Sequence, residues 1–203
     1  MSEEIDKQRR LFEDDTILVE AFQSGDKKAF DKLVLGHMNR IFNLCYRFLG
    51  NYEEANDSAQ ETFIKAYRSL DGFKLQSSFS TWLYRIAVNT CKNRLKSVEY
   101  RNAEKTVSID ESVRSNEGGE YNVEMGDETM SPTNVLGKKE TSDRIQLAID
   151  SLPDEQKEVV VLRDVEGLSY EEIAEITGNE LGTVKSKLAR AREKLREKLK
   201  ELI

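Results

Sequence analysis

The chain has 203 residues, a net charge of -7 and 38% hydrophobic residues, which suffices for one or two small domains with modest cores. With one histidine and two cysteines, there is little material for a zinc site or an imidazole-based triad, so we expect no metal, no cofactor and no enzyme. No apolar stretch reaches the ~18–20 residues that span a bilayer, and the first residues lack a basic start, so we expect a cytoplasmic protein without direct membrane insertion.

Two helices are predicted at the start of the chain. Asp15 can cap a first helix that Ser24 and Gly25 end, and Asp26 can cap a second helix that closes at Gly50. Spacings of three and four residues predict a continuous apolar stripe on the second helix. The stripe consists of Phe30, Leu33, Val34, Ile41, Leu44, Cys45 and Phe48.

His37 lies on the same stripe, so a packing role is favoured over metal ligation. Cys45 and Cys91 both lie among apolar residues of helical pattern. We expect them to be reduced packing residues rather than a disulfide or a metal pair.

A third helix is predicted from about Tyr52 to Leu70. Its apolar face carries Ala55, Ala59, Phe63, Ala66 and Leu70. The opposite face carries Asp57, Gln60, Glu61 and Lys65, which suits either solvent or a partner protein.

A loop from Gly72 to Ser78 leads to a fourth predicted helix, capped by Ser80 and running from Thr81 to about Ser97. Its start mixes aromatics with hydroxyl, amide and cationic side chains. Such a mixture can receive unpaired bases, because each stacked base contributes roughly 1–3 kcal/mol. The plain alternative is a hydrophobic helix whose aromatics only pack.

Between residues 98 and 134 the helical pattern disappears, so we expect an extended linker. Residues 99–128 hold nine acidic and three basic side chains, a net charge of -6. On composition alone, a plain flexible tether is an equally good interpretation.

Helical pattern returns from Leu136 onward, with Pro153 suited to the first turn of a second helix that ends near Gly167. Ser169 to Glu172 match a capping box that opens a short helix, which stops at Gly178. A basic helix starts near Gly182. This order predicts a helix-turn-helix, whose second helix enters the major groove of DNA.

The last helix separates an apolar seam from a basic face. Residues 181–203 hold eight basic and three acidic side chains, a net charge of +5, so this end of the chain can attract phosphate. A charge run is usually only a solvated helix surface. Here small and hydroxyl side chains stand between the cations of the first turns, as base-edge and phosphate contacts require.

Four motifs, in this order and spacing, resemble the extracytoplasmic-function sigma factors of bacterial RNA polymerase, and within them the RpoE-like group. The motifs are Asp57 to Tyr67, Phe79 to Asn93, Leu168 to Ala174 and Gly182 to Arg192. The resemblance implies an all-α chain with a sigma-2-like bundle (1–97), an acidic linker (98–134) and a sigma-4-like helix-turn-helix domain (135–203).

Site residues follow from the resemblance, each on a matching motif position. Binding to core polymerase, through its beta' and beta subunits, is implied for Asp57, Gln60, Glu61 and Phe63. Minus-ten DNA binding is implied for Phe73, Phe79, Trp82, Arg85, Asn89, Lys92 and Asn93, with Arg94 a further phosphate contact. Minus-thirty-five DNA binding is implied for Arg163, Thr183, Lys185, Ser186, Lys187, Ala189, Arg190 and Arg192.

Departures from the family pattern occur at three positions within these motifs. Ser58 stands where members usually have an aliphatic residue, and Lys185 and Lys187 where members often have arginine. Lysine lacks the planar fork of arginine, so phosphate anchoring is expected to outweigh bidentate guanine reading.

The resemblance also implies a linker that threads the RNA-exit region, an anti-sigma factor as partner, a stress or envelope response, and no obligate homo-oligomer. Three other classes were weighed. A stand-alone helix-turn-helix regulator would need a sensor or phosphoacceptor domain, for which residues 1–97 show no α/β pattern. An enzyme is disfavoured because the chain has a single histidine and no phosphate-binding glycine loop. A purely structural adaptor would not explain the basic helix.

Overall fold

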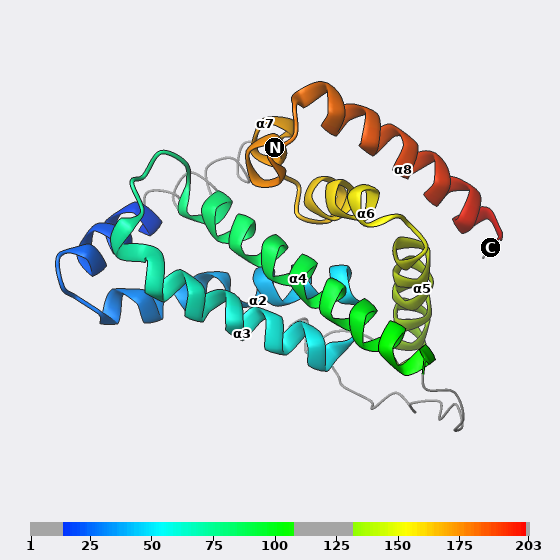
Figure 1. Cartoon of the computed structure of the whole chain (residues 1–203), viewed down its shortest axis with the longest axis horizontal. Helices are drawn as coiled ribbons and strands as arrows, with labels where there is room; N and C mark the ends of the chain where they lie inside the picture. Colours follow the sequence, from blue (N-terminus) through cyan, green and yellow to red (C-terminus); the bar gives the residue numbers. More distant parts are fainter. Residues whose placement is uncertain (1–13, 108–131, 202–203) are drawn as a thin grey trace.

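The computed structural model describes residues 14–107 and 132–201, and every regular element in those ranges is helical (Figure 1), which confirms the all-α prediction. We call residues 14–107 the front module and residues 132–201 the rear module. After a first helix over 14–23, the front module contains α2 (Lys28–Leu49), α3 (Tyr52–Ser69), the 3-10 turn η1 (Leu70–Gly72) and α4 (Phe79–Val107). The rear module contains α5 (Pro132–Asp150), α6 (Asp154–Val160), the π-helical turn η2 (Val161–Val165), α7 (Tyr170–Thr177) and α8 (Leu181–Glu201).

The helices that border the predicted linker are longer than expected. α4 continues to Val107, and α5 begins at Pro132. Residues 99–107 contain neither glycine nor proline and include alanine, glutamate, lysine and arginine, which favour helices. Proline is well tolerated at a first helical position. The remainder of the predicted linker, 108–131, lies outside the described residues.

Three helix ends follow the sequence signals. Gly50 and Gly178 adopt left-handed conformations at the ends of α2 and α7, with φ of 68° and 69°. Ser169 forms the predicted capping box with Glu172. Asn51, which had not been singled out, caps α3 by accepting the backbone N–H of Glu54 at 3.0 Å.

Two predicted N-caps are wrong and one is partial. Ser78 caps α4 in place of Ser80, since its Oγ accepts the Thr81 backbone N–H at 3.0 Å. Asp15 lies inside the first helix, where its buried carboxylate accepts a hydrogen bond from His37 Nε2 at 2.9 Å. Asp26 accepts only the Lys28 N–H, at 3.1 Å. A tertiary partner far along the chain thus replaced the local cap at Asp15.

His37 is a satisfied packing residue, as predicted. It is 2% exposed, is held by Asp15, and meets the ring of Phe79 edge-on at a centroid distance of 5.3 Å. Its position therefore ties the first helix to α2 and to the start of α4.

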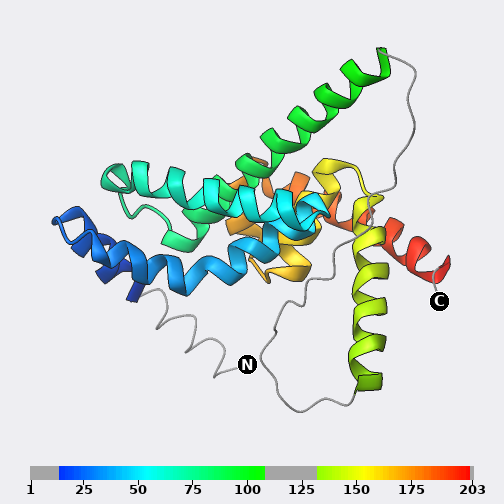
Figure 2. The ribbon, with the colours of Figure 1, turned by 90° about the horizontal axis from the view of Figure 1, so that it is seen from below.

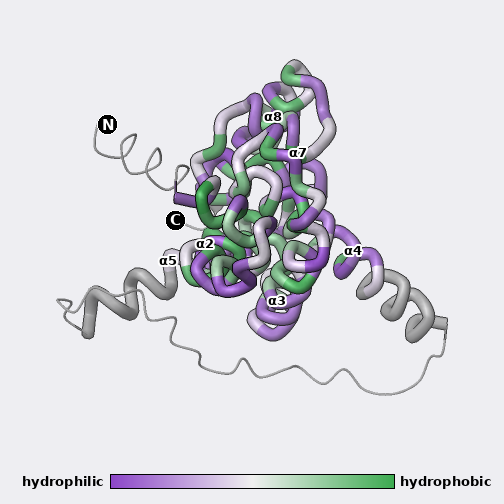
Figure 3. The backbone as a smooth tube through the Cα atoms, turned by 90° about the vertical axis from the view of Figure 1, so that its left-hand side faces the viewer, coloured by the Kyte–Doolittle hydropathy of each residue, from purple (hydrophilic) through white to green (hydrophobic). Residues whose placement is uncertain are grey.

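The front module is a bundle in which α2, α3 and α4 run alongside one another, while α8 crosses α6 in the rear module (Figures 1 and 2). Hydrophilic residues follow the outer surface of α3, and hydrophobic stretches gather where the helices meet (Figure 3). None of the helices in the described ranges is long and apolar enough to cross a membrane.

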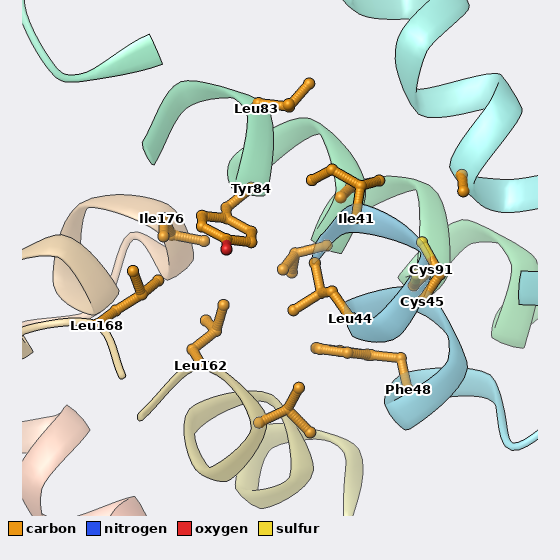
Figure 4. Close-up of a cluster of buried hydrophobic side chains, with 14 of the residues drawn as sticks. Ile41, Leu44, Cys45, Phe48, Leu83, Tyr84, Cys91, Leu162, Leu168 and Ile176 are labelled. Atoms are coloured by element: carbon orange, nitrogen blue, oxygen red, sulfur yellow. The ribbon is translucent and has the colours of Figure 1, made fainter. Parts of the chain in front are cut away.

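The two modules share one hydrophobic core. Leu44 and Phe48 of α2 and Tyr84 of α4 lie close to Leu162 and Ile176 of the rear module (Figure 4). All five side chains are at most 5% exposed. The modules therefore pack directly against each other.

Cys45 and Cys91 face each other between α2 and α4 as free, fully buried thiols (Figure 4). The hydrogen bond with Cys45, together with burial, raises the pKa of the Cys91 thiol. Since the thiolate is the reactive form, the Cys91 thiol is poorly reactive. Both cysteines are free packing residues and form no disulfide, as the sequence predicted.

Candidate nucleic-acid interface

An aromatic cluster stands at the start of α4. The Phe73 and Trp82 ring centroids are 4.8 Å apart, and Phe79 lies 5.8 Å from Trp82 and 6.5 Å from Phe73. Phe73 is 8% exposed and Phe79 only 2%, whereas Trp82 is half-buried. Trp82 is thus the most exposed of the three rings, and the two phenylalanines pack against it.

The loop before this cluster is fixed by local bonds. Ser78 Oγ lies 2.9 Å from the Ser80 hydroxyl and 2.7 Å from the Thr81 hydroxyl. Leu75 has a φ of 54°, a left-handed conformation that is costly for a branched side chain. Such strained residues cluster at ligand sites, so the loop is a plausible wall for a captured base.

The remaining minus-ten candidates lie along α4 in two groups. Asn89 and Asn93 are exposed, with amides available to a ligand. Arg85 and Lys92 are half-buried and point at the rear module, where Lys92 Nζ lies 2.6 Å from a Glu158 carboxylate oxygen. In this arrangement the two cations are already paired.

The exposed face of α3 carries the predicted polymerase contacts. Asp57, Gln60 and Glu61 are exposed, and Phe63 is half-buried against the core. Ser58 is fully buried on the opposite side. The departure from the family pattern at Ser58 therefore lies within the core and not on this face.

Arg94 binds α3 rather than standing free for phosphate. Its Nη2 donates to Asp57 at 2.9 Å, and its Nε lies 2.5 Å from a Glu54 carboxylate oxygen. The sequence-based assignment of Arg94 to the DNA backbone missed this arrangement, because the two partners lie one helix earlier.

The helix-turn-helix consists of α7 and α8. Val184 and Leu188 are at most 2% exposed and anchor α8 to the module. The predicted base-reading residues Lys185, Ser186, Ala189 and Arg190 are all exposed on the other face. The predicted separation of a buried seam from an exposed basic face is confirmed.

Tyr170 stands between two of the candidate cations. The Arg163 guanidinium lies 4.8 Å from the ring centre and the Lys185 ammonium 5.6 Å from it. Arg163 also donates to the Leu168 carbonyl. Tyr170 therefore brings Arg163, from the π-helical turn, and Lys185, from α8, to one surface.

Lys187 and Arg192 are paired within the rear module. Lys187 Nζ lies 3.0 Å from Glu155 and 3.2 Å from Asn179 Oδ1, and its hydrogen bond lowers the pKa of the Glu155 carboxyl. Arg192 Nε donates to Asp164 at 3.0 Å, and that bond raises the pKa of Arg192. Thr183 is half-buried at the start of α8.

Four acidic residues of the rear module face α4 and were not recognised in the sequence: Glu158, Glu166, Glu172 and Glu175. Glu158 is 2% exposed, and burial raises its pKa despite the nearby Lys92. Burial also raises the pKa of Glu166. For Glu158, the sequence did offer one signal of burial, because this residue directly precedes the apolar run Val159 to Leu162.

Comparisons with known proteins agree with this geometry. The family models "Sigma-70 region 2" and "Sigma-70, region 4" match residues 33–99 and 142–195. The RNA polymerase sigma-H factor of Pseudomonas aeruginosa is 40% identical over 191 residues, covering 94% of this chain and 96% of that protein. The ECF RNA polymerase sigma-E factor of Escherichia coli is 40% identical over 189 residues, covering 93% and 96%.

Two solved structures share the fold. A sigma factor RpoE from Bartonella quintana, solved with the anti-sigma factor NepR, has a TM-score of 0.64 at 24% identity and covers 85% of this chain and 98% of that one. CnrH, solved with the cytosolic domain of CnrY, has a TM-score of 0.66 at 24% identity and covers 93% and 98%.

A helical bundle, a helix-turn-helix and two candidate DNA surfaces define a transcription initiation protein. The chain belongs to the extracytoplasmic-function group of the sigma-70 family. Members are non-enzymatic factors that bind core RNA polymerase, direct it to promoters and help to open the DNA.

Proposed function

We propose that the front module captures the opened minus-ten region and that the rear module grips the minus-thirty-five duplex, within functional boundaries at 1–97 and 135–203. The observation that carries this division is the presence of two different surfaces on one chain. One is an aromatic cluster with a partly exposed indole, and the other is a helix with exposed cationic and hydroxyl side chains.

At the minus-ten region, Trp82 stacks at the junction between paired and unpaired DNA. Phe73 and Phe79 support it, and Asn89 reads a base edge with its paired donor and acceptor. Arg85, Lys92 and Asn93 hold the backbone. Opening needs no nucleotide hydrolysis, because capture of the exposed bases offsets an unstacking cost of a few kcal/mol.

At the minus-thirty-five region, the exposed residues of α8 contact base edges: Lys185, Ser186, Ala189 and Arg190. Thr183, Lys187, Arg192 and Arg163 contact the backbone. Lys187 and Arg192 must then exchange Glu155 and Asp164 for phosphate. Their net gain is smaller than that of Lys185, whose side chain is exposed.

On the polymerase side, α3 docks on the coiled coil of the beta' subunit through Asp57, Gln60, Glu61 and Phe63. The beta subunit contacts the rear module. Arg94 orients Asp57 for this role, since it fixes that carboxylate at 2.9 Å. The acidic linker occupies a basic surface of the polymerase near the RNA exit, and nascent RNA later occupies the same surface.

Two further properties belong to this proposal. The protein works in the cytoplasm, in a stress or envelope response, and an anti-sigma factor holds it inactive until a signal arrives. The likeness in fold to the sigma factor RpoE, which was solved with the anti-sigma factor NepR, supports the second property.

Run-off transcription with purified core polymerase tests the proposal, followed by mapping of start sites in cells that overproduce the chain. We expect initiation from a defined set of promoters. Asp57→Asn should weaken core binding, whereas Asp31→Asn, an exposed carboxylate in the first turn of α2, should not. A chain that binds no core polymerase, or binds it without directing initiation, would refute the assignment.

A further inference from the structure

Gln23 is the last residue of the first helix, and its side chain reaches the start of the loop that leads to the aromatic cluster. Its Nε2 donates to the Leu70 carbonyl at 2.9 Å and to the Phe73 carbonyl at 2.8 Å. These acceptors lie 47 and 50 residues further along the chain. The two hydrogens of one carboxamide therefore hold both ends of the turn that presents Phe73.

The residues around Gln23 fix its place at the end of α3. Phe22 is fully buried, and its ring meets the ring of Tyr67 on α3 edge-on at a centroid distance of 5.3 Å. Lys27 adds a weaker link to the same turn, since its Nζ lies 3.3 Å from Asp71 while both side chains are at least half exposed. The first helix is thus packed so that Gln23 faces the beginning of the loop.

The first helix also acts on the far end of this loop. Asp15 holds His37 at 2.9 Å, and the His37 ring meets the Phe79 ring edge-on. The segment 73–79 therefore has both ends tied to one short helix. Between these ends Leu75 has a φ of 54°, and such a strained residue persists only where the surrounding structure fixes it.

We propose that Gln23 is a positioning residue for promoter opening, which holds the Phe73 end of the loop in the conformation that captures unpaired minus-ten bases. The inference rests on the proposed function of the aromatic cluster. Gln23 acts through Phe73, whose ring packs on Trp82 at a centroid distance of 4.8 Å. A loop that is already ordered loses little further conformational entropy when bases bind, so this brace raises the affinity for DNA without a contact of its own.

The exposure of Gln23 separates this role from folding. Gln23 is exposed, whereas Phe22 beside it is fully buried. The Leu70 carbonyl also accepts the Phe73 N–H at 3.1 Å, so it keeps one donor when the Gln23 side chain is truncated. Truncation should therefore loosen the loop while the bundle stays folded.

The test uses holoenzyme assembled from core polymerase and the full chain. Gln23→Ala removes both hydrogen bonds, and Gln23→Glu keeps the size but replaces the donor with a carboxylate oxygen, which two carbonyls repel. Ser24→Ala, at the adjacent exposed position, is the control. The probes are a single-stranded oligonucleotide with the nontemplate minus-ten sequence of a promoter mapped by run-off transcription, and a minus-thirty-five duplex.

We expect Gln23→Ala to weaken oligonucleotide binding roughly three- to tenfold, with Gln23→Glu at least as weak. Permanganate reactivity of the promoter should fall in parallel, while duplex affinity and the thermal unfolding midpoint stay those of the unaltered chain. Ser24→Ala should change none of these quantities. Oligonucleotide binding and opening that are unaffected by both Gln23 variants would overturn the proposal. Equal losses on the two DNA probes would also overturn it, because they indicate general damage to the protein.

A double-variant cycle tests whether Gln23 acts through the aromatic cluster. In the Trp82→Ala background, Gln23→Ala should weaken oligonucleotide binding by less than about twofold, because the ring on which Phe73 packs is gone. Full and independent losses would contradict the proposal. Failure of the proposed function looks different, because the unaltered holoenzyme would then not initiate transcription, whatever the Gln23 variants do.

Discussion

Tyr84 on α4 donates its phenol hydrogen to Oε2 of Glu166 in the rear module, at 2.7 Å. Tyr84 is 4% exposed and lies within the shared hydrophobic core (Figure 4). Burial raises the pKa of both groups, and the adjacent carboxylate further raises that of the tyrosine. A single hydrogen bond thus joins a buried tyrosine and a half-buried carboxylate from different modules.

Tyr84→Phe should destabilise the free chain by about 1–3 kcal/mol, because the half-buried Glu166 carboxylate loses its donor. Urea denaturation of the full chain measures the change. Tyr67→Phe serves as the control, since Tyr67 is 43% exposed, and it should stay within about 0.5 kcal/mol. Equal stabilities for the two variants would show that the Tyr84–Glu166 bond contributes nothing.

The stability of the free chain should fall with rising pH through two carboxyl groups. Glu158 and Glu166 have folded pKa values above their ordinary 4.5, mainly because of burial. A raised pKa means that their contribution is complete below about 4.5 and is lost as the pH rises through the folded value.

Glu158→Gln and Glu166→Gln should therefore gain stability relative to the unaltered chain as the pH rises above about 4.5. Denaturation at a series of pH values gives the difference directly. Glu193→Gln, which changes an exposed carboxyl, should show a constant difference across the series. A constant difference for the two buried positions as well would contradict the assigned pKa directions.

Trp82→Ala should reduce promoter opening while leaving the fold and duplex binding intact. The half-buried indole supplies the accessible stacking face, and its loss should cost about 1–3 kcal/mol of base capture. Permanganate reactivity of unpaired thymines reports the opening, and Trp82→Phe should retain part of it. Phe79→Ala is expected to behave differently, with a loss of about 3–5 kcal/mol in folding, because its ring is 2% exposed.

Lys187→Ala and Arg192→Ala should weaken binding of minus-thirty-five duplex and reduce the salt dependence, because both side chains are assigned to the DNA backbone. Each phosphate contact that is lost lowers the slope of log affinity against log salt by about 0.9. Lys194→Ala, at an exposed position further along α8, removes the same charge and should change the slope less. An unchanged slope for both variants would contradict the assignment of Lys187 and Arg192 to the DNA backbone.

Two glycines of the helix-turn-helix should respond oppositely to alanine. Gly178 has a φ of 69°, so Gly178→Ala should destabilise the module by about 1 kcal/mol even though a Cβ there meets nothing within 4 Å. Gly182 lies in helical backbone and is equally open, so Gly182→Ala should stabilise by about 0.4–1 kcal/mol. Thermal unfolding of both variants separates backbone conformation from packing.

Sequence periodicity predicted which residues of each helix are buried, because one apolar face leaves a local pattern. It predicted the exposed face of α8 for the same reason, and the motif from Ser169 to Glu172 predicted the capping box. It could not identify the partner of a polar residue in another module. Lys157 illustrates this limit, since its Nζ donates to the Phe48 carbonyl at 3.3 Å while the side chain is 8% exposed.

The helix caps show a similar limit. Asp15 has the composition of an N-cap, but a tertiary bond to His37 uses its carboxylate instead. Ser78 and Ser80 are equally good caps by type, and only the backbone geometry decides between them. Where several local solutions are close in free energy, the packing of distant helices determines the outcome.

The continuous core between the modules bears on how a cell shares its polymerase among competing initiation factors. A partner that binds only chains whose modules have separated would bind with an apparent affinity reduced by the open fraction. Conservative changes at Leu162 or Ile176 could therefore change the apparent affinity with which the chain competes with other initiation factors for core polymerase. Every residue that touches polymerase or promoter would stay the same.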